Sequence, residues 1–289
     1  MFWTKKDEIM KKIKALIWII RPELPVAAGI CVVVGQVIAH GKFPPIATIA
    51  LGFALGFFLS SSAMVFNDIF DLEVDRLNAP QRPLPSGMLT KPEAIVWGVC
   101  LGMVGLILAV FISPMAFVLS LVLWTLGFLF NWRLKSAGLW GNLIVSLNVA
   151  MTIIIGGVSV GGAASPMVWI FGAIAFFFDL AEEIAGDAMD IVGDLERGSK
   201  SIAIVHGKQP ALKVSAILLG VVIALTIVPI LLGETSPRYW VPIALMDLVI
   251  VVFTCRLFQS KTPQEGRQAM RVMYLSATLG LAAFIVGRF

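Results

Sequence analysis

Apolar residues gather along this chain into long blocks, separated by short segments rich in charged residues, proline and glycine. A helix needs roughly 20 mostly apolar residues to cross a bilayer. The pattern therefore predicts an all-α membrane protein with nine spanning helices. The expected spans are residues 23–40, 46–66, 92–111, 115–131, 139–160, 166–186, 210–232, 238–257 and 267–287.

Ahead of the first span, residues 5–20 combine lysines with Ile9, Ile13 and Ile17 at helical spacing. This pattern is typical of a basic amphipathic helix that lies on an anionic leaflet. A cleaved signal peptide fits poorly, because the basic segment runs directly into a span of full length. We expect residues 1–289 to form a single membrane domain.

Composition supports the same class of protein. Hydrophobic residues make up 58% of the chain, charged residues only 14%, and the mean hydropathy is +0.93. No soluble domain has such an excess of apolar residues, so we expect a multi-pass protein of the cell membrane with no nucleic-acid partner. The cysteines stand singly in apolar stretches and predict no disulfide, and the two histidines predict no zinc or haem site. These residues are Cys31, Cys100, Cys255, His40 and His206.

Basic residues are distributed unevenly between the two sides of the predicted bundle. If the N-terminus is cytoplasmic, the outer segments receive only Lys42, Arg238 and Arg288 of the 22 lysines and arginines. The positive-inside rule favours this orientation. Two acidic segments, residues 67–75 and 182–194, then lie on the same cytoplasmic side.

The first acidic segment begins with Asn67, and Asp71 and Asp75 follow at steps of four residues. On one helix these three form a stripe, with Asp68 about 100° around the axis from Asn67. Like charges at this spacing repel, so a bound cation explains the pattern. Oxygen ligands suit Mg²⁺, which also bridges to substrate phosphates. A solvated helix end is the plainer alternative.

A proline-rich segment, residues 78–87, follows and cannot continue the helix. Within it Arg82 stands between Gln81 and Pro83, and its planar guanidinium suits a pair of phosphate oxygens. The alternative is that Arg82 has no role at a site and is an ordinary loop arginine on the cytoplasmic side, as the positive-inside rule predicts.

The second acidic segment lies where the sixth predicted span ends. Its carboxylates are spaced by four, three and four residues and would share one helix face. We expect Gly186 and Gly193 to break this helix. A simple polar cap is the alternative, although Asp179 and Glu182 lie within or directly after the apolar run. The four carboxylates are Glu183, Asp187, Asp190 and Asp194.

Two carboxylate stripes on one side of a membrane, followed by Arg197, Lys200 and Lys208, suit one chemical task. Divalent cations would link the stripes to a diphosphate, and the basic side chains would take up its charge as it departs. The adjacent apolar bundle would hold a hydrocarbon tail. The pattern therefore points to an isoprenyl diphosphate as substrate.

The motif Asn67-Asp68-x-x-Asp71-x-x-x-Asp75, followed by Arg82-Pro83-Leu84-Pro85-Ser86-Gly87 and a second Asp-rich motif, resembles the UbiA superfamily of intramembrane prenyltransferases. The resemblance covers nearly the whole chain. It implies nine membrane helices bundled around a central cavity, with both motifs on the cytoplasmic side. The second motif, residues 183–201, is similar to the archaeal branch, which joins a geranylgeranyl group to geranylgeranylglyceryl phosphate.

The resemblance also implies a Mg²⁺-dependent transferase with a prenyl diphosphate donor and a lipophilic acceptor. Two Mg²⁺ ions would be held by Asn67, Asp71, Asp75, Asp187, Asp190 and Asp194, to which we add Asp68. The diphosphate would contact Arg21, Asn67, Arg82, Lys135 and Lys200. The residues expected to carry catalysis are Asn67, Asp71, Arg82 and Asp187.

Two departures from the family pattern leave the acceptor open. Glu182 stands where archaeal relatives often have arginine, and residues 130–135 lack the tyrosine that many relatives place before the basic residue. An aromatic prenyltransferase of quinone biosynthesis is therefore an alternative. A membrane transporter, a phospholipid-type phosphotransferase and a non-catalytic membrane protein are further alternatives, but the two distant acidic segments at one interface fit them less well.

Overall fold

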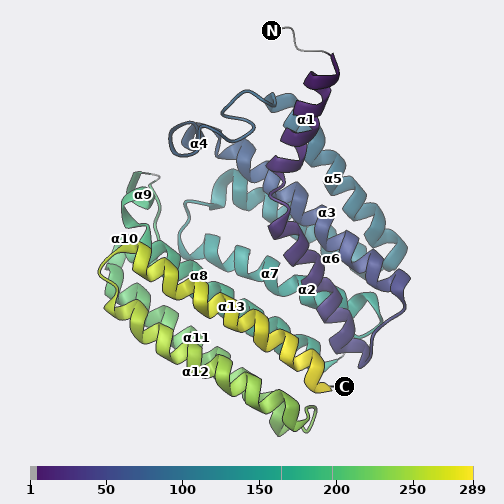
Figure 1. Ribbon diagram of the computed structural model, residues 1–289, viewed down its shortest axis with the longest axis vertical. Helices are drawn as coiled ribbons and strands as arrows, with labels where there is room; N and C mark the ends of the chain where they lie inside the picture. Colours follow the sequence, from purple (N-terminus) through teal and green to yellow (C-terminus); the bar gives the residue numbers. More distant parts are fainter. Residues whose placement is uncertain (1–4, 164, 197, 289) are drawn as a thin grey trace.

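The computed structural model describes residues 5–163, 165–196 and 198–288, and every regular element in these ranges is a helix (Figure 1). Arg197, expected above in a basic loop, and the side chain of Arg288 lie outside the described part. The nine long helices match the nine predicted blocks. They are α2 (Glu23–His40), α3 (Ile46–Phe70), α5 (Lys91–Ile112), α6 (Pro114–Leu129), α7 (Leu139–Ser159), α8 (Pro166–Met189), α11 (Lys208–Leu231), α12 (Pro237–Gln259) and α13 (Pro263–Arg288).

Five shorter elements connect or flank these helices. An α-helix precedes the first block, a π-helical turn extends α6, and three short helices lie in connections at one end of the bundle. They are α1 (Lys5–Ile19), α4 (Leu72–Asn78), η1 (Phe130–Leu134), α9 (Ile191–Glu196) and α10 (Ile202–His206).

Seven helices in the described residues are long and apolar enough to cross a membrane, counting α6 and η1 together. The other two long helices, α8 and α13, have 24 and 26 residues. Each combines its apolar residues with more polar ones, because α8 carries Asp179, Glu182 and Glu183 and α13 begins with several charged residues. The prediction of nine spans therefore stays a prediction for these two helices.

Local sequence explains where several helices begin. Thr90 and Glu93 form a capping box at the start of α5, in which each side chain bonds the other residue's backbone N–H. The Ser113 hydroxyl accepts the backbone N–H of Ala116 at the start of α6. Proline occupies the first turn of α5, α6, α8 and α12, where its missing N–H costs no hydrogen bond.

The core divides into two main parts. One part joins α7, α8, α11, α12 and α13 and also includes residues of α2. Figure 1 shows α11, α12 and α13 side by side at one edge of the molecule. The other part joins α1, α3 and α5. Helices α2 and α7 link the two through very close packing: a Cβ added at Gly35 would lie 2.0 Å from the carbonyl oxygen of Ile153.

Helix α1 packs on α5 through part of its surface. The Trp97 indole donates to the carbonyl of Leu16 at 3.2 Å, and Lys12 pairs with Glu93. Ala15 and Ile19 are buried, whereas Ile9, Ile13 and Ile17 are each about half exposed. The exposed apolar stripe is consistent with the predicted helix at a membrane surface.

Both acidic segments bend at an aspartate. Helix α3 ends at Phe70 and α4 starts at Leu72, so Asp71 forms the junction; Asp190 separates α8 from α9 in the same way. The prediction of one helix through the first segment is therefore wrong. The expected breaks at Gly186 and Gly193 are also wrong, because these glycines lie inside α8 and α9.

Candidate active site

The three aspartates of the first segment are each paired with a cation outside that segment. Arg21, in the turn between α1 and α2, forms an ion pair with the buried Asp68. The turn requires an unusual backbone, since Arg21 has φ 47°. This is a strained value for a residue with a side chain, and such strain is concentrated at functional sites.

Arg82 occupies the proline-rich loop, and its Nη1 lies 2.6 Å from both carboxylate oxygens of the buried Asp75. The same nitrogen is 3.9 Å from Asp68. The loop is fixed by the buried side chains of Leu84 and Leu89. Partial burial opposes the charge on Arg82, but its hydrogen bond to Asp75 and the nearby carboxylates outweigh this and raise the pKa of the guanidinium above its usual value.

Lys135 follows η1 directly and forms an ion pair with Asp71. Its Nζ also lies 3.3 Å from Oδ1 of Asn67, and it is close enough to Glu183 for an electrostatic interaction. Short π-helical turns occur frequently at functional sites. Here the turn places one lysine between the two acidic segments.

The second acidic segment is held differently. Asn142 on α7 donates to Asp187 at 2.8 Å, and Arg267 at the start of α13 lies 3.4 Å from Asp190. Asp194, on α9, is buried. Sequence reasoning missed Asn142 and Arg267, although an asparagine on an otherwise apolar helix was a signal that could have drawn attention to the first.

The loops beside the two segments lie against each other. The backbone N–H of Lys200 donates to the carbonyl of Ser136 at 3.2 Å. Gly138 has φ 62°, and a Cβ there would lie 2.1 Å from the carbonyl oxygen of Lys200. The side chain of Lys200 is exposed at this contact. Residues 130–142 thus touch both acidic segments or their loops.

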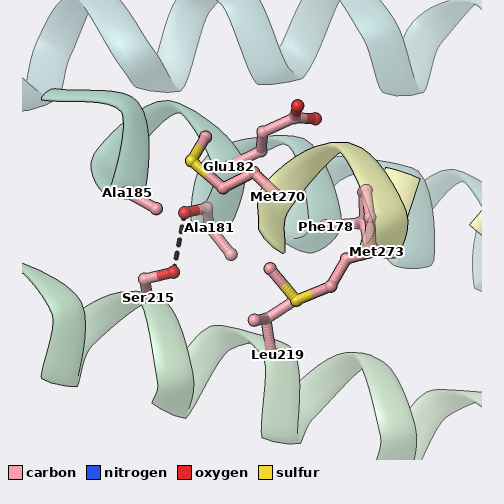
Figure 2. Close-up of a pocket in the computed structure, with 8 residues that line it drawn as sticks. All are labelled: Phe178, Ala181, Glu182, Ala185, Ser215, Leu219, Met270 and Met273. Carbon is pink, nitrogen blue, oxygen red and sulfur yellow. Dashed lines mark hydrogen bonds between the residues drawn. The ribbon is translucent and has the colours of Figure 1, made fainter. Parts of the chain in front are cut away.

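Along α8, Asp179, Glu182 and Glu183 extend the acidic surface toward the middle of the bundle. Ser146 of α7 donates to Asp179 at 2.8 Å. Glu182 borders a small gap of about 10 Å³ between α8, α11 and α13. Figure 2 shows its carboxylate directed away from Ser215, which donates instead to the carbonyl of Ala181 at 2.8 Å. This gap is too small for a substrate.

The predicted metal ligands fit Mg²⁺ by chemistry, since all are carboxylate or amide oxygens. They do not form a preassembled cage: in the described part of the chain, no three His, Cys, Asp or Glu side chains are grouped closely enough to hold a metal ion. Repulsion among like charges explains this arrangement, because Asp68, Asp71, Asp75 and Asp190 are each oriented toward a separate cation. Binding a metal would require these side chains to exchange partners.

Comparison with known proteins finds relatives that match nearly the whole chain. The model of the UbiA prenyltransferase family matches residues 28–278. Digeranylgeranylglyceryl phosphate synthase of Thermococcus sibiricus is 31% identical over 276 residues, which cover 96% of this chain and 98% of the relative.

Two solved structures share the fold. A structure of digeranylgeranylglyceryl phosphate synthase superposes with a TM-score of 0.82 at 27% identity, over 96% of this chain and 98% of the other. A UbiA homologue from Archaeoglobus fulgidus, bound to GPP and Mg²⁺, superposes with a TM-score of 0.65 at 16% identity, over 96% of this chain and 99% of the other.

Proposed function

Because the chain belongs to the UbiA prenyltransferase family, we propose that it transfers a geranylgeranyl group from geranylgeranyl diphosphate to geranylgeranylglyceryl phosphate. The product would be a diether lipid, with diphosphate released. The names of its relatives support this acceptor, since digeranylgeranylglyceryl phosphate synthases match the chain over nearly its full length.

The observation that carries the proposal is the set of cations on the first acidic segment. Arg21, Arg82 and Lys135 come from three separate parts of the chain and converge on a stretch of eight residues from Asp68 to Asp75. Each already holds a carboxylate oxygen. The same guanidinium and ammonium groups can bind phosphate oxygens instead.

We infer that Mg²⁺ would be held by Asn67, Asp68, Asp71 and Asp75 on one side and by Asp187, Asp190 and Asp194 on the other. When bound, it would neutralise part of the diphosphate charge and make the diphosphate a better leaving group. Asn142 and Arg267 would orient Asp187 and Asp190 for this role.

The residues of the chain then have distinct tasks. Arg82 and Lys135 stabilise the charge that develops on the departing oxygens as the bond between C1 of the prenyl chain and the diphosphate breaks, and Arg21 holds the diphosphate. The bonding electrons go with the diphosphate, so the prenyl chain becomes an allylic cation. The acceptor hydroxyl attacks C1, forms the ether bond and releases its proton.

The apolar bundle completes the site. Water would capture the cation, so it must be excluded from the reacting carbon. The chain is a multi-pass membrane protein, and we propose that its N-terminus and both acidic segments face the cytoplasm, because this orientation leaves few basic residues outside.

Product analysis tests this function. The purified protein in nanodiscs receives Mg²⁺, labelled geranylgeranyl diphosphate and either geranylgeranylglyceryl phosphate or 4-hydroxybenzoate. We expect an EDTA-sensitive diether product with the first acceptor. Release of diphosphate with neither acceptor would contradict the proposal.

One observation favours a second candidate, transfer to an aromatic ring. Asp179, Glu182 and Glu183 make the adjoining face of α8 acidic, and Lys135 is the cation that acts on Glu183 there. Such a face disfavours an acceptor that carries a phosphate. A prenylated 4-hydroxybenzoate in the experiment above would establish this alternative.

A further inference from the structure

A cavity of about 380 Å³ lies where α12 ends and α13 begins, and none of its lining residues belongs to the acidic segments or has a task in the proposed reaction. One part of its lining is apolar and the other polar. The apolar residues are Phe253, Ala269 and Val272, and the polar residues are Arg256, Gln259, Ser260, Glu265 and Gln268.

Arg256 is the cation of this cavity. Its guanidinium lies over the ring of Phe253, with Cζ 4.8 Å from the ring centroid. No carboxylate in the described part of the chain lies within ion-pair distance of it. Stacking on an aromatic ring orients the fork of N–H donors without neutralising it.

The surroundings add to the positive charge. Lys208 donates to the carbonyl and hydroxyl oxygens of Ser260 at 2.9 and 3.2 Å, and Lys261 is the next residue. Glu265 is the acid in the lining, but its carboxylate accepts the backbone N–H of Lys261 at 2.8 Å and so caps the start of α13. The cavity therefore favours an anion.

The position of the cavity indicates which anion. It lies at the ends of two long helices, where the headgroup region of a bilayer meets a membrane protein. Leu248, Val251 and Val252 on α12 are exposed, as residues facing lipid chains are. We propose that the cavity binds the phosphate headgroup of an anionic bilayer lipid. Arg256 holds the phosphate, and Phe253 and Val272 contact the first carbons of the chains.

This site touches the second acidic segment. A Cβ at Gly266 would lie 2.1 Å from Sδ of Met189, the last residue of α8, and the Ser260 hydroxyl is 3.9 Å from the same sulfur. Arg267, which neighbours Gln268 of the lining, pairs with Asp190. A bound headgroup therefore restrains the start of α13 and, through it, the position of Asp190.

Native mass spectrometry of the purified protein titrated with phosphatidylglycerol tests the site without any prenyl donor. Arg256→Gln should weaken the tightest lipid-binding site about five- to tenfold, and Arg256→Lys should restore only part of the affinity, because lysine keeps the charge but lacks the stacked fork of donors. The matched control is Arg271→Gln, an exposed arginine on α13 that does not line the cavity. It should bind as the unmodified protein does.

Competition identifies the source of the phosphate. Glycerol 1-phosphate and inorganic phosphate at millimolar concentration should leave the bound lipid in place. Displacement by either would overturn the lipid assignment in favour of a soluble phosphate ester. Equal loss in Arg256→Gln and Arg271→Gln would overturn the site itself, because only surface charge would then matter. Unchanged thermal unfolding of each variant establishes that the fold is intact.

Discussion

Asp71 and Asp187 are held by different kinds of partner, a lysine in the first case and an amide in the second. Neither is fully buried, so neither contributes much to the core. We expect Asp71→Ala and Asp187→Ala each to lower turnover by at least about 100-fold, while the unfolding free energy changes by less than about 1 kcal/mol.

Diphosphate release under saturating substrate measures this loss. Glu73→Ala is the matched control, because Glu73 is an exposed acid of α4 that pairs only with Arg76 among the described residues. It should retain activity within about twofold. Full activity of purified Asp71→Ala would contradict the proposed metal site.

Substitution of Asn142 tests whether Mg²⁺ binding requires the hydrogen bond that orients Asp187. Removing its amide leaves Asp187 in place but without the 2.8 Å hydrogen bond. We expect Asn142→Ala to require about 10- to 100-fold more Mg²⁺ for half-maximal activity, with the maximal rate largely recovered at high Mg²⁺. Asn148→Ala on the same helix is the control, since Asn148 bonds only the carbonyl of Ile144. An equal Mg²⁺ requirement in both variants would assign Asn142 a purely structural role.

Arg82 has a structural task as well as a chemical one. Asp75 is 5% exposed and depends on Arg82 for its hydrogen bonds. Arg82→Gln should therefore lower the unfolding free energy by about 2 kcal/mol, and Arg82→Lys by less. Chemical unfolding in detergent measures this, with the exposed Arg76→Gln expected to change it by less than about 0.5 kcal/mol. A stable Arg82→Gln protein would mean that Asp75 finds another donor.

At the scale of whole elements, α2 and α7 pack very closely against each other. The Cβ of Gly35→Ala would lie 2.0 Å from the carbonyl oxygen of Ile153, so one helix must move. We expect a loss of about 2–3 kcal/mol in unfolding free energy, measured by thermal or chemical unfolding. Gly220→Ala in α11 is the control, because a Cβ there meets nothing within 4 Å, and it should be neutral or slightly stabilising.

Helix boundaries follow from the sequence better than the bends between helices. The block at residues 23–40 was predicted to the residue as α2, because prolines, glycines and charges mark its ends. The bend at Asp71 could not be predicted from spacing. The hydrogen bonds from Asp71 N to Asn67 O and from Asp75 N to Asp71 O keep the helical step of four residues through the junction.

The sequence also does not predict which residues contact the site residues. The conclusion that Arg21, Arg82 and Lys135 serve the site depended on a family resemblance, and the carboxylate that each one contacts depends on how α1, the proline-rich loop and η1 pack. Trp132 shows the limit of such reasoning. The sequence favours Phe57, Phe58, Phe128 and Trp132 as lining of the apolar substrate pocket, yet Trp132 is half exposed and its ring packs against Arg133.

In the whole molecule, the two acidic segments lie on different parts of the core. The first lies on the part built by α1, α3 and α5, and the second on the part built by α7, α8 and α11. The segment from η1 to Asn142 is the link between them. A movement of one part against the other would therefore change the separation of the two sets of carboxylates.

The three ion pairs of the first segment give it a balance of charge that the second segment lacks. Three cations face Asp68, Asp71 and Asp75, whereas Asp179, Glu182, Glu183 and Asp187 stand together on α8. Ionised carboxylates at the second segment would therefore attract metal ions at short range more than they attract the anionic donor. Raising the ionic strength should weaken the apparent affinity for Mg²⁺ and leave the KM for the donor at saturating Mg²⁺ nearly constant. Steady-state kinetics across a salt series measures both, and an equal salt dependence of the two would show that the first segment carries a net field of its own.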